Sequence, residues 1–173
     1  MGLVESPLGG LVLALAGFIL LAITVAWALS PARRTRRPQL LAALASAAVV
    51  FLLNMLAKAV GIWEWYGYHL PMMQQLGMLF ALPSVLFTLV LGGYRQLELR
   101  TRRPLLVYAL IAAIILVPVT VGGDLYTMNR GNLAFGRGYT IFADVLVGQA
   151  LVWLPVVLYL LFRRALGGLT THY

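Results

Sequence analysis

The chain has 173 residues, of which 62% are hydrophobic and 10% charged, and its mean hydropathy is +0.92. These values lie far from those of a water-soluble domain, so they exclude a soluble catalytic module. The net charge of +8 would suit a nucleic-acid partner in a soluble protein, but here the arginines stand in short clusters between apolar runs. Because that pattern is typical of the cytoplasmic loops of membrane proteins, we predict no nucleic-acid partner.

Five apolar runs are each long enough to cross a bilayer, which takes about 20 residues. They cover residues 8–29, 40–63, 72–91, 105–121 and 141–162. The first run has no basic segment before it and is followed by arginines, so we expect a retained span rather than a signal peptide. The predicted fold class is all-α integral membrane, with residues 1–173 as a single polytopic domain of five transmembrane helices.

The distribution of arginine predicts the orientation of the spans. Ten arginines fall on one side of the membrane, and only Arg130 and Arg137 fall on the other. Lysine and arginine accumulate in cytoplasmic loops, so the N-terminus is expected outside the cytoplasm and the C-terminus inside it. The expected location is the plasma membrane, which is the inner membrane in a double-membrane cell.

A short motif indicates an internal repeat. The tetrapeptide TRRP occurs at residues 35–38 and again at 101–104, each time before an apolar run. In the first copy Asn54 precedes a glycine by seven positions, and in the second copy Asp124 does. Spans 1 to 3 would then correspond to spans 3 to 5, with helix 3 shared, and such repeats often place a site at their interface. The alternative is coincidence, because short matches are common among arginine-rich segments.

This pattern resembles that of the small membrane lycopene cyclases, carotenoid cyclases that also carry the unit twice. The resembling residues are Asn54, Gly61, Ile62 and Trp63 in the first copy and Asp124 and Gly131 in the second. The resemblance implies a protein that acts within the bilayer on long isoprenoid chains, protonating an olefin so that a ring closes through a carbocation without net redox change. The Pro-x-Glu-Glu or Pro-x-Glu-Asp stretch of that family is absent, because Pro71 is followed by MMQQ.

Four ionisable side chains are candidate catalytic residues: Glu64, Asp124, Lys58 and Asp144. Lys58 and Asp144 lie at matching depths, about one turn inside the outer ends of spans 2 and 5, so we predict that they face each other. An ion pair that only fixes helix packing is the alternative to a working site. Glu64 and Asp124 lie at the outer mouth, where partial desolvation favours a carboxyl group that can donate a proton. Solvated loop carboxylates are the alternative there.

The candidate substrate-binding residues belong to the same outer side. They are Asn54, Trp63, Trp65, Tyr66, Tyr126, Asn129 and Arg130. An interfacial aromatic belt would use the same aromatic residues, and Arg130 would equally serve to hold an anion or to pair with a carboxylate. With no cysteine and two histidines in the chain, we predict no metal site and no cofactor.

These features support three hypotheses about function. The first is a membrane-embedded enzyme or binding protein for a lipophilic, isoprenoid-like substrate, with acid-base chemistry of the cyclase or isomerase type. The second is a small transporter or flippase, for which paired intramembrane charges are also natural. The third is a structural subunit of a membrane complex. The expected partner is a membrane lipid or isoprenoid, and the sequence leaves open a homo-oligomer or a partner in a larger membrane assembly.

Overall fold

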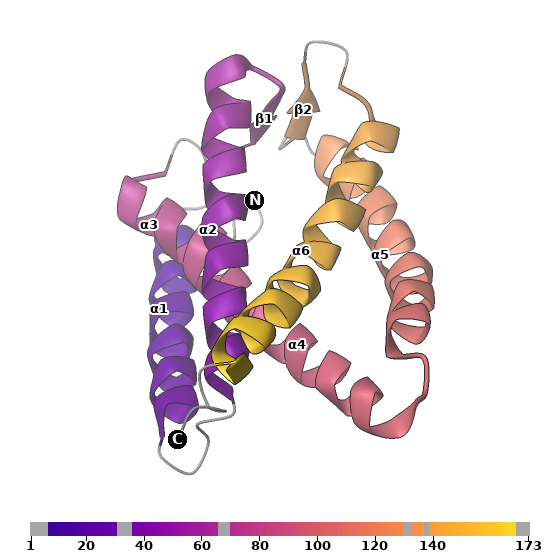
Figure 1. The fold of residues 1–173 in the computed structure, drawn as a ribbon. Helices are drawn as coiled ribbons and strands as arrows, with labels where there is room; N and C mark the ends of the chain where they lie inside the picture. The colour runs from indigo at the N-terminus through magenta and orange to yellow at the C-terminus, as the bar shows by residue number, and fades with distance from the viewer. Residues whose placement is uncertain (1–6, 31–35, 66–69, 130–132, 137–138, 169–173) are drawn as a thin grey trace.

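The computed structural model describes residues 7–30, 36–65, 70–129, 133–136 and 139–168 (Figure 1). In chain order its elements are α1 (Pro7–Leu29), α2 (Arg37–Val60), β1 (Trp63–Trp65), α3 (Met72–Leu76), the π-helical turn η4 (Gly77–Ala81), α4 (Leu82–Arg100), α5 (Pro104–Asn129), β2 (Leu133–Phe135) and α6 (Ile141–Gly168).

Five helical segments are long and apolar enough to cross a membrane. They are Leu8–Leu29, Arg37–Val60, Met72–Arg100, Pro104–Tyr126 and Ile141–Leu166. The prediction of five membrane-length apolar helices is therefore confirmed. Several helices extend beyond the predicted apolar runs, because a helix can continue into the polar region once its apolar length is complete.

The second span ends earlier than predicted, at Val60 rather than at Trp63. Gly61 takes a left-handed conformation with φ of 69°, and the backbone N–H of Ile62 donates to the carbonyl of Ala57 at 2.9 Å. This arrangement closes the last turn of a helix, and glycine adopts it without steric cost. The chain then leaves α2 as an extended strand.

The third span is a helix in three parts, α3, η4 and α4. Pro83 lies in the first turn of α4 and has no backbone N–H to donate to the preceding turn, which is the usual cause of a local widening of a helix. Small residues let α1 approach this widened turn closely. A Cβ added to Gly77 would lie 2.4 Å from Cα of Ala14, so only glycine fits there.

The chain runs back and forth between two ends of the helix bundle. Figure 1 shows the end of α1, the start of α2, the α4–α5 turn and the end of α6 toward one end, and β1 with β2 at the other. We call the first the arginine-rich end, defined by Arg36, Arg37, Arg100, Arg102, Arg103, Arg163 and Arg164, and the second the ribbon end. Helix α2 packs most extensively on α6 and α4.

The best-packed part of the core lies toward the arginine-rich end. Its fully buried residues include Ala42 and Ala43 of α2, Leu91 of α4 and Val156 of α6. Because alanine side chains are small, they let α2 lie close to its neighbours. Aromatic side chains fill the remaining space and connect α4, α5 and α6.

Candidate functional site

A pocket of about 320 Å³ lies toward the ribbon end of the bundle. Its lining comes from α2 (Leu53, Asn54), η4 (Leu79), α5 (Thr120, Asp124), β2 (Phe135) and α6 (Asp144, Val147, Gly148, Leu151). Five of these ten residues have apolar side chains, one is a glycine, and the four polar residues include two with carboxyl groups. A concave, mostly apolar site with a few converging polar groups is the usual form of a small-molecule pocket.

The two acids of the pocket come from neighbouring helices. Asp124 lies near the end of α5 and Asp144 lies in the first turn of α6, and their carboxyl groups are within hydrogen-bonding reach of each other. Two carboxylates can only accept hydrogen bonds, so their contact is favourable when one of them carries a proton. This geometry brings together a proton donor and a proton acceptor in one place.

Tyr139 connects the acid pair to the loop before α6. Its hydroxyl group donates a hydrogen bond to Oδ1 of Asp144 at 3.0 Å, and its ring packs edge-on against Phe135 with centroids 5.4 Å apart. Burial, and then the nearby charge of Asp144, raises the pKa of Tyr139 above the usual value of tyrosine. The phenol therefore keeps its proton and acts toward Asp144 as a donor.

The start of α6 also favours a negative charge on Asp144. The hydroxyl oxygen of Thr140 accepts a hydrogen bond from the backbone N–H of Ala143 at 3.2 Å, which caps the first turn. Asp144 lies within that turn, where the partial positive charge of the helix N-terminus stabilises a carboxylate.

Helix α6 contributes a glycine, Gly148, to the pocket lining. A Cβ added to Gly148 would lie 3.6 Å from Oγ1 of Thr120, an ordinary van der Waals contact. Alanine would therefore fit, whereas the outer atoms of a larger side chain would enter the pocket. On the α2 side, Nδ2 of Asn54 donates to the carbonyl of Val50 at 2.9 Å, which holds the amide against its own helix.

A two-stranded ribbon closes the same end of the bundle. Strands β1 and β2 pair antiparallel, with Glu64 opposite Ala134, and the backbone N–H of Gly136 donates to the carbonyl of Ile62 at 2.7 Å. A Cβ at Gly136 would lie only 2.6 Å from the carbonyl oxygen of Gly61, so glycine is required for this close approach. The ribbon fastens the end of α2 to the segment between α5 and α6, and its Phe135 reaches the pocket.

The structure brings three of the predicted site residues together and separates others. Asn54, Asp124 and Asp144 line the one pocket. Lys58 is exposed in the last turn of α2 and is not among the lining residues, and its pairing with Asp144 stays a prediction.

The other predicted residues fall outside the pocket lining or outside the described part of the chain. Tyr126 and Asn129 are exposed on α5. Strand β1 consists of Trp63, Glu64 and Trp65, of which the structure describes the backbone only. Tyr66 and Arg130 lie outside the described residues.

Sequence reasoning missed four residues that shape the pocket: Tyr139, Phe135, Thr120 and Gly148. Tyr139 stands five positions before Asp144 in a segment rich in glycine, and no helical or strand periodicity reveals that it turns back toward the carboxyl group. Gly148 lies within a long apolar run, where a pocket-facing glycine cannot be told from a packing glycine.

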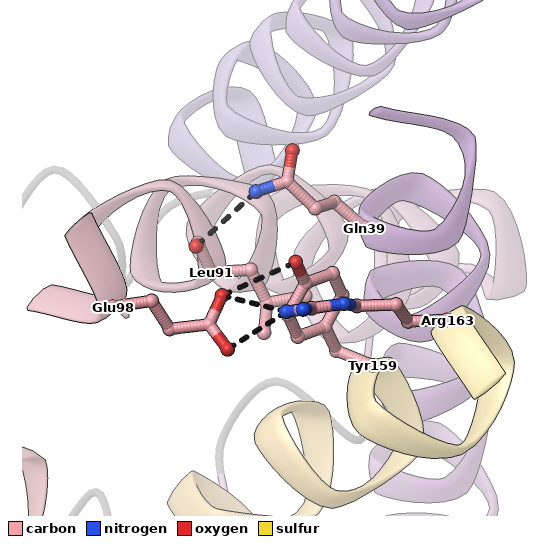
Figure 2. A network of polar contacts seen from close by, with 5 residues as sticks. All are labelled: Gln39, Leu91, Glu98, Tyr159 and Arg163. Carbon is pink, nitrogen blue, oxygen red and sulfur yellow. Dashed lines mark hydrogen bonds and ion pairs between the residues drawn. The ribbon is translucent and has the colours of Figure 1, made fainter. Parts of the chain in front are cut away.

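A second polar cluster lies at the arginine-rich end (Figure 2). Nη1 of Arg163 donates to both carboxylate oxygens of Glu98 at 2.9 and 3.1 Å, and the hydroxyl of Tyr159 donates to the same carboxylate at 3.5 Å. Close by, Nε2 of Gln39 donates to the carbonyl of Leu91 at 3.3 Å. These contacts join α2, α4 and α6, and none of these residues lines the pocket at the ribbon end.

Comparison with known protein families, curated proteins and solved structures finds no match to this chain.

Proposed function

We propose that this protein binds the end of a lipophilic, isoprenoid-like molecule in the pocket at the ribbon end and changes it by acid-base chemistry of the cyclase or isomerase type. The observation that carries the proposal is the meeting of Asp124 and Asp144 in a pocket whose walls are otherwise mostly apolar. Ionisable side chains within apolar membrane helices are costly, and such residues are usually functional.

The chemistry needs one acid and one base. A carboxylic acid adds its proton to one carbon of a terminal double bond, and the positive charge forms on the other carbon. A second double bond of the chain attacks that carbon, a carbon–carbon bond forms and the ring closes. The neighbouring carboxylate stabilises the cation and then removes a proton from an adjacent carbon, so atoms balance and no oxidant is needed.

The size of the pocket supports a substrate bound by one end. A volume of about 320 Å³ is at the lower limit of ligand pockets, which run from roughly 300 to 1,000 Å³. A long chain would place its reacting end among Leu53, Leu79 and Leu151 and leave the remainder among lipid tails.

The functional test is expression in cells that accumulate a linear polyene or another linear prenyl lipid. We expect a new chromatographic species with the wild type and its loss with Asp124→Asn or Asp144→Asn. Glu98→Gln is the matched control, because Glu98 is an acid at the opposite end of the bundle. An unchanged lipid profile across several linear isoprenoids, with folded protein in the membrane, would refute the enzymatic proposal.

A proton-coupled transporter is the second candidate. Its specific support is the acid pair beside η4, because a widened helical turn at a pocket is a natural point of movement and Leu79 of η4 lines this pocket. Protonophore-sensitive flux in vesicles, without any new lipid species, would favour this function over catalysis.

We further propose that the ribbon end faces the outside of the cytoplasm, that the arginine-rich end faces the cytoplasm, and that the membrane is the plasma membrane. The clustering of arginine at one end supports this orientation. The presence of Asn54 and Asp124 in one pocket supports the internal three-helix repeat, in which these residues correspond. The chain has no native cysteine, so single introduced cysteines report topology without background.

We expect impermeant thiol reagents to label cysteines at Ser6, Tyr68 and Leu133 in intact cells and to leave cysteines at Thr35 and Thr101 unlabelled. The reverse pattern would overturn the orientation.

A further inference from the structure

The two aspartates of the pocket are chemically similar, but their surroundings differ. Asp144 accepts a hydrogen bond from Tyr139 at 3.0 Å and lies in the first turn of α6. Both features stabilise the charged form of a carboxyl group, since a hydroxyl donor and a helix N-terminus each present positive charge to it.

Asp124 has the opposite surroundings. It lies five residues before the end of α5, nearer to the negative end of that helix, and its strongest neighbouring charge is the carboxylate of Asp144. The pocket that both aspartates line has an apolar wall that includes Leu53, Leu79 and Leu151. A like charge and an apolar wall both favour the neutral form of a carboxyl group.

Other charged and titratable groups lie on the helices that line the pocket. Helix α2 contributes Lys58, which is exposed in its last turn, and α5 contributes Tyr126, which is also exposed. The ammonium group of Lys58 would stabilise the charged form of the aspartate that lies closer to it. The side chain of Glu64 and the residues Arg130 and Arg137 lie outside the described part of the chain.

We infer that Asp124 holds the shared proton and presents it to the pocket, that Asp144 is the carboxylate beside it, and that Tyr139 is the positioning residue that fixes this order. Which aspartate carries the proton can be measured without a substrate, whereas the catalytic role of that aspartate rests on the proposed function. In that function Asp124 is the acid that starts the reaction, and Asp144 stabilises the cation and takes up the released proton.

Infrared spectroscopy of the full chain in lipid nanodiscs tests this order without any substrate. The variant Asp144→Asn removes the charge beside Asp124 but keeps the apolar pocket wall, and we expect it to show the C=O band of a protonated carboxyl group in mildly acidic buffer. The variant Asp124→Asn leaves Asp144, and we expect that band to be absent. Matching spectra from the two variants, or the reverse assignment, would overturn the inference.

The role of Tyr139 needs a separate variant. Adding Tyr139→Phe to Asp124→Asn removes the hydrogen bond to the Asp144 carboxylate, so the carboxylate stretching band of Asp144 should shift in frequency. Adding Tyr139→Phe to Asp144→Asn should leave the carboxyl C=O band of Asp124 unchanged in frequency, because Tyr139 donates to Asp144. A shift in both backgrounds, or in neither, would contradict a positioning role.

A third variant is informative if one of the asparagine variants does not fold. The single variant Tyr139→Phe removes the hydroxyl group that stabilises the Asp144 carboxylate, so Asp144 should compete with Asp124 for the proton. We then expect the C=O band of the protonated carboxyl group to split or broaden. An unchanged band would contradict the inference. Since no spectrum requires a substrate, failure here is distinguishable from failure of the lipid assay, which tests the proposed function.

Discussion

The two ends of the helix bundle use polar side chains in opposite ways. At the arginine-rich end, Glu98 contacts Arg163 and Tyr159 (Figure 2). Buried aromatic rings of α4, α5 and α6 pack against one another at the same end. At the ribbon end, Asp124 and Asp144 face a pocket instead of a packed core. The first arrangement stabilises the bundle, whereas the second keeps an acid pair accessible.

The difference between the ends follows from helix spacing. Alanines of α2 allow close packing where α2 meets α4 and α6, and tyrosines fill the gap toward α5. Toward the ribbon end, α2 and α5 each contribute a polar residue, Asn54 and Asp124, and Gly148 leaves the space between them empty. We therefore expect changes at the arginine-rich end to alter stability, and changes in the pocket to alter ligand binding and activity.

The largest loss of stability should come from Tyr108→Ala. Tyr108 is buried, its hydroxyl donates to the carbonyl of Val152 at 2.8 Å, and its ring packs edge-on against Tyr94 and Trp153. Removing a buried aromatic ring typically costs about 3–5 kcal/mol. Thermal unfolding in detergent measures the effect, and Tyr126→Ala on the same helix is the control, because Tyr126 is 59% exposed. Equal losses for the two variants would contradict the difference in packing.

The next largest effect should come from Gly136→Ala in the ribbon. The added methyl group would lie 2.6 Å from the carbonyl oxygen of Gly61, so the two backbone segments must separate. Such overpacking costs about 1–3 kcal/mol. Hydrogen exchange at the amide of residue 136 should become faster, because its hydrogen bond to Ile62 is lost. Gly122→Ala, where the added methyl group meets no atom within 4 Å, is the control and should exchange like the wild type.

A smaller effect is expected for the predicted pair of Lys58 and Asp144. If the two interact across α2 and α6, Lys58→Met and Asp144→Leu each lower thermal stability in detergent, because each leaves a charge without its partner. The double variant should recover part of the loss, with a coupling of about 1 kcal/mol. Additive losses would show that Asp144 depends on Tyr139 and Asp124 rather than on Lys58.

The smallest effect should come from Glu98→Gln at the arginine-rich end. The side chains of Arg163 and Glu98 are 57% and 20% exposed, and ion pairs of this kind contribute at most about 1 kcal/mol. A loss of several kcal/mol would mean that the Glu98 carboxylate, and not aromatic packing, holds this end together. Thermal unfolding at low and high salt separates the two contributions, since only the ion pair weakens with salt.

The sequence predicts the helices well because the membrane limits the possibilities. A run of about 20 apolar residues has few alternatives to a spanning helix, so the five spans follow from length and composition. Asn54 and Asp124, which the predicted repeat would relate, line the same pocket, and the repeat itself stays a prediction.

The features that the sequence did not predict depend on contacts between distant segments. The β1–β2 ribbon pairs residues about 70 positions apart, and strands of three residues carry no readable periodicity. The contact of Tyr139 with Asp144 depends on the path of a loop, and the contact of Glu98 with Arg163 depends on how α4 and α6 cross. Neither arrangement follows from the spacing of residues along one helix.

Mass spectrometry of the lipids retained by the purified protein shows whether the pocket at the ribbon end holds a lipophilic molecule. Gly148→Leu would fill the pocket from α6, while Gly122→Leu adds the same side chain where the structure has open space. We predict that the wild type and Gly122→Leu each retain about one isoprenoid-like molecule per chain, and that Gly148→Leu loses most of it. Equal retention by the two leucine variants, or no specific lipid in the wild type, would contradict the account.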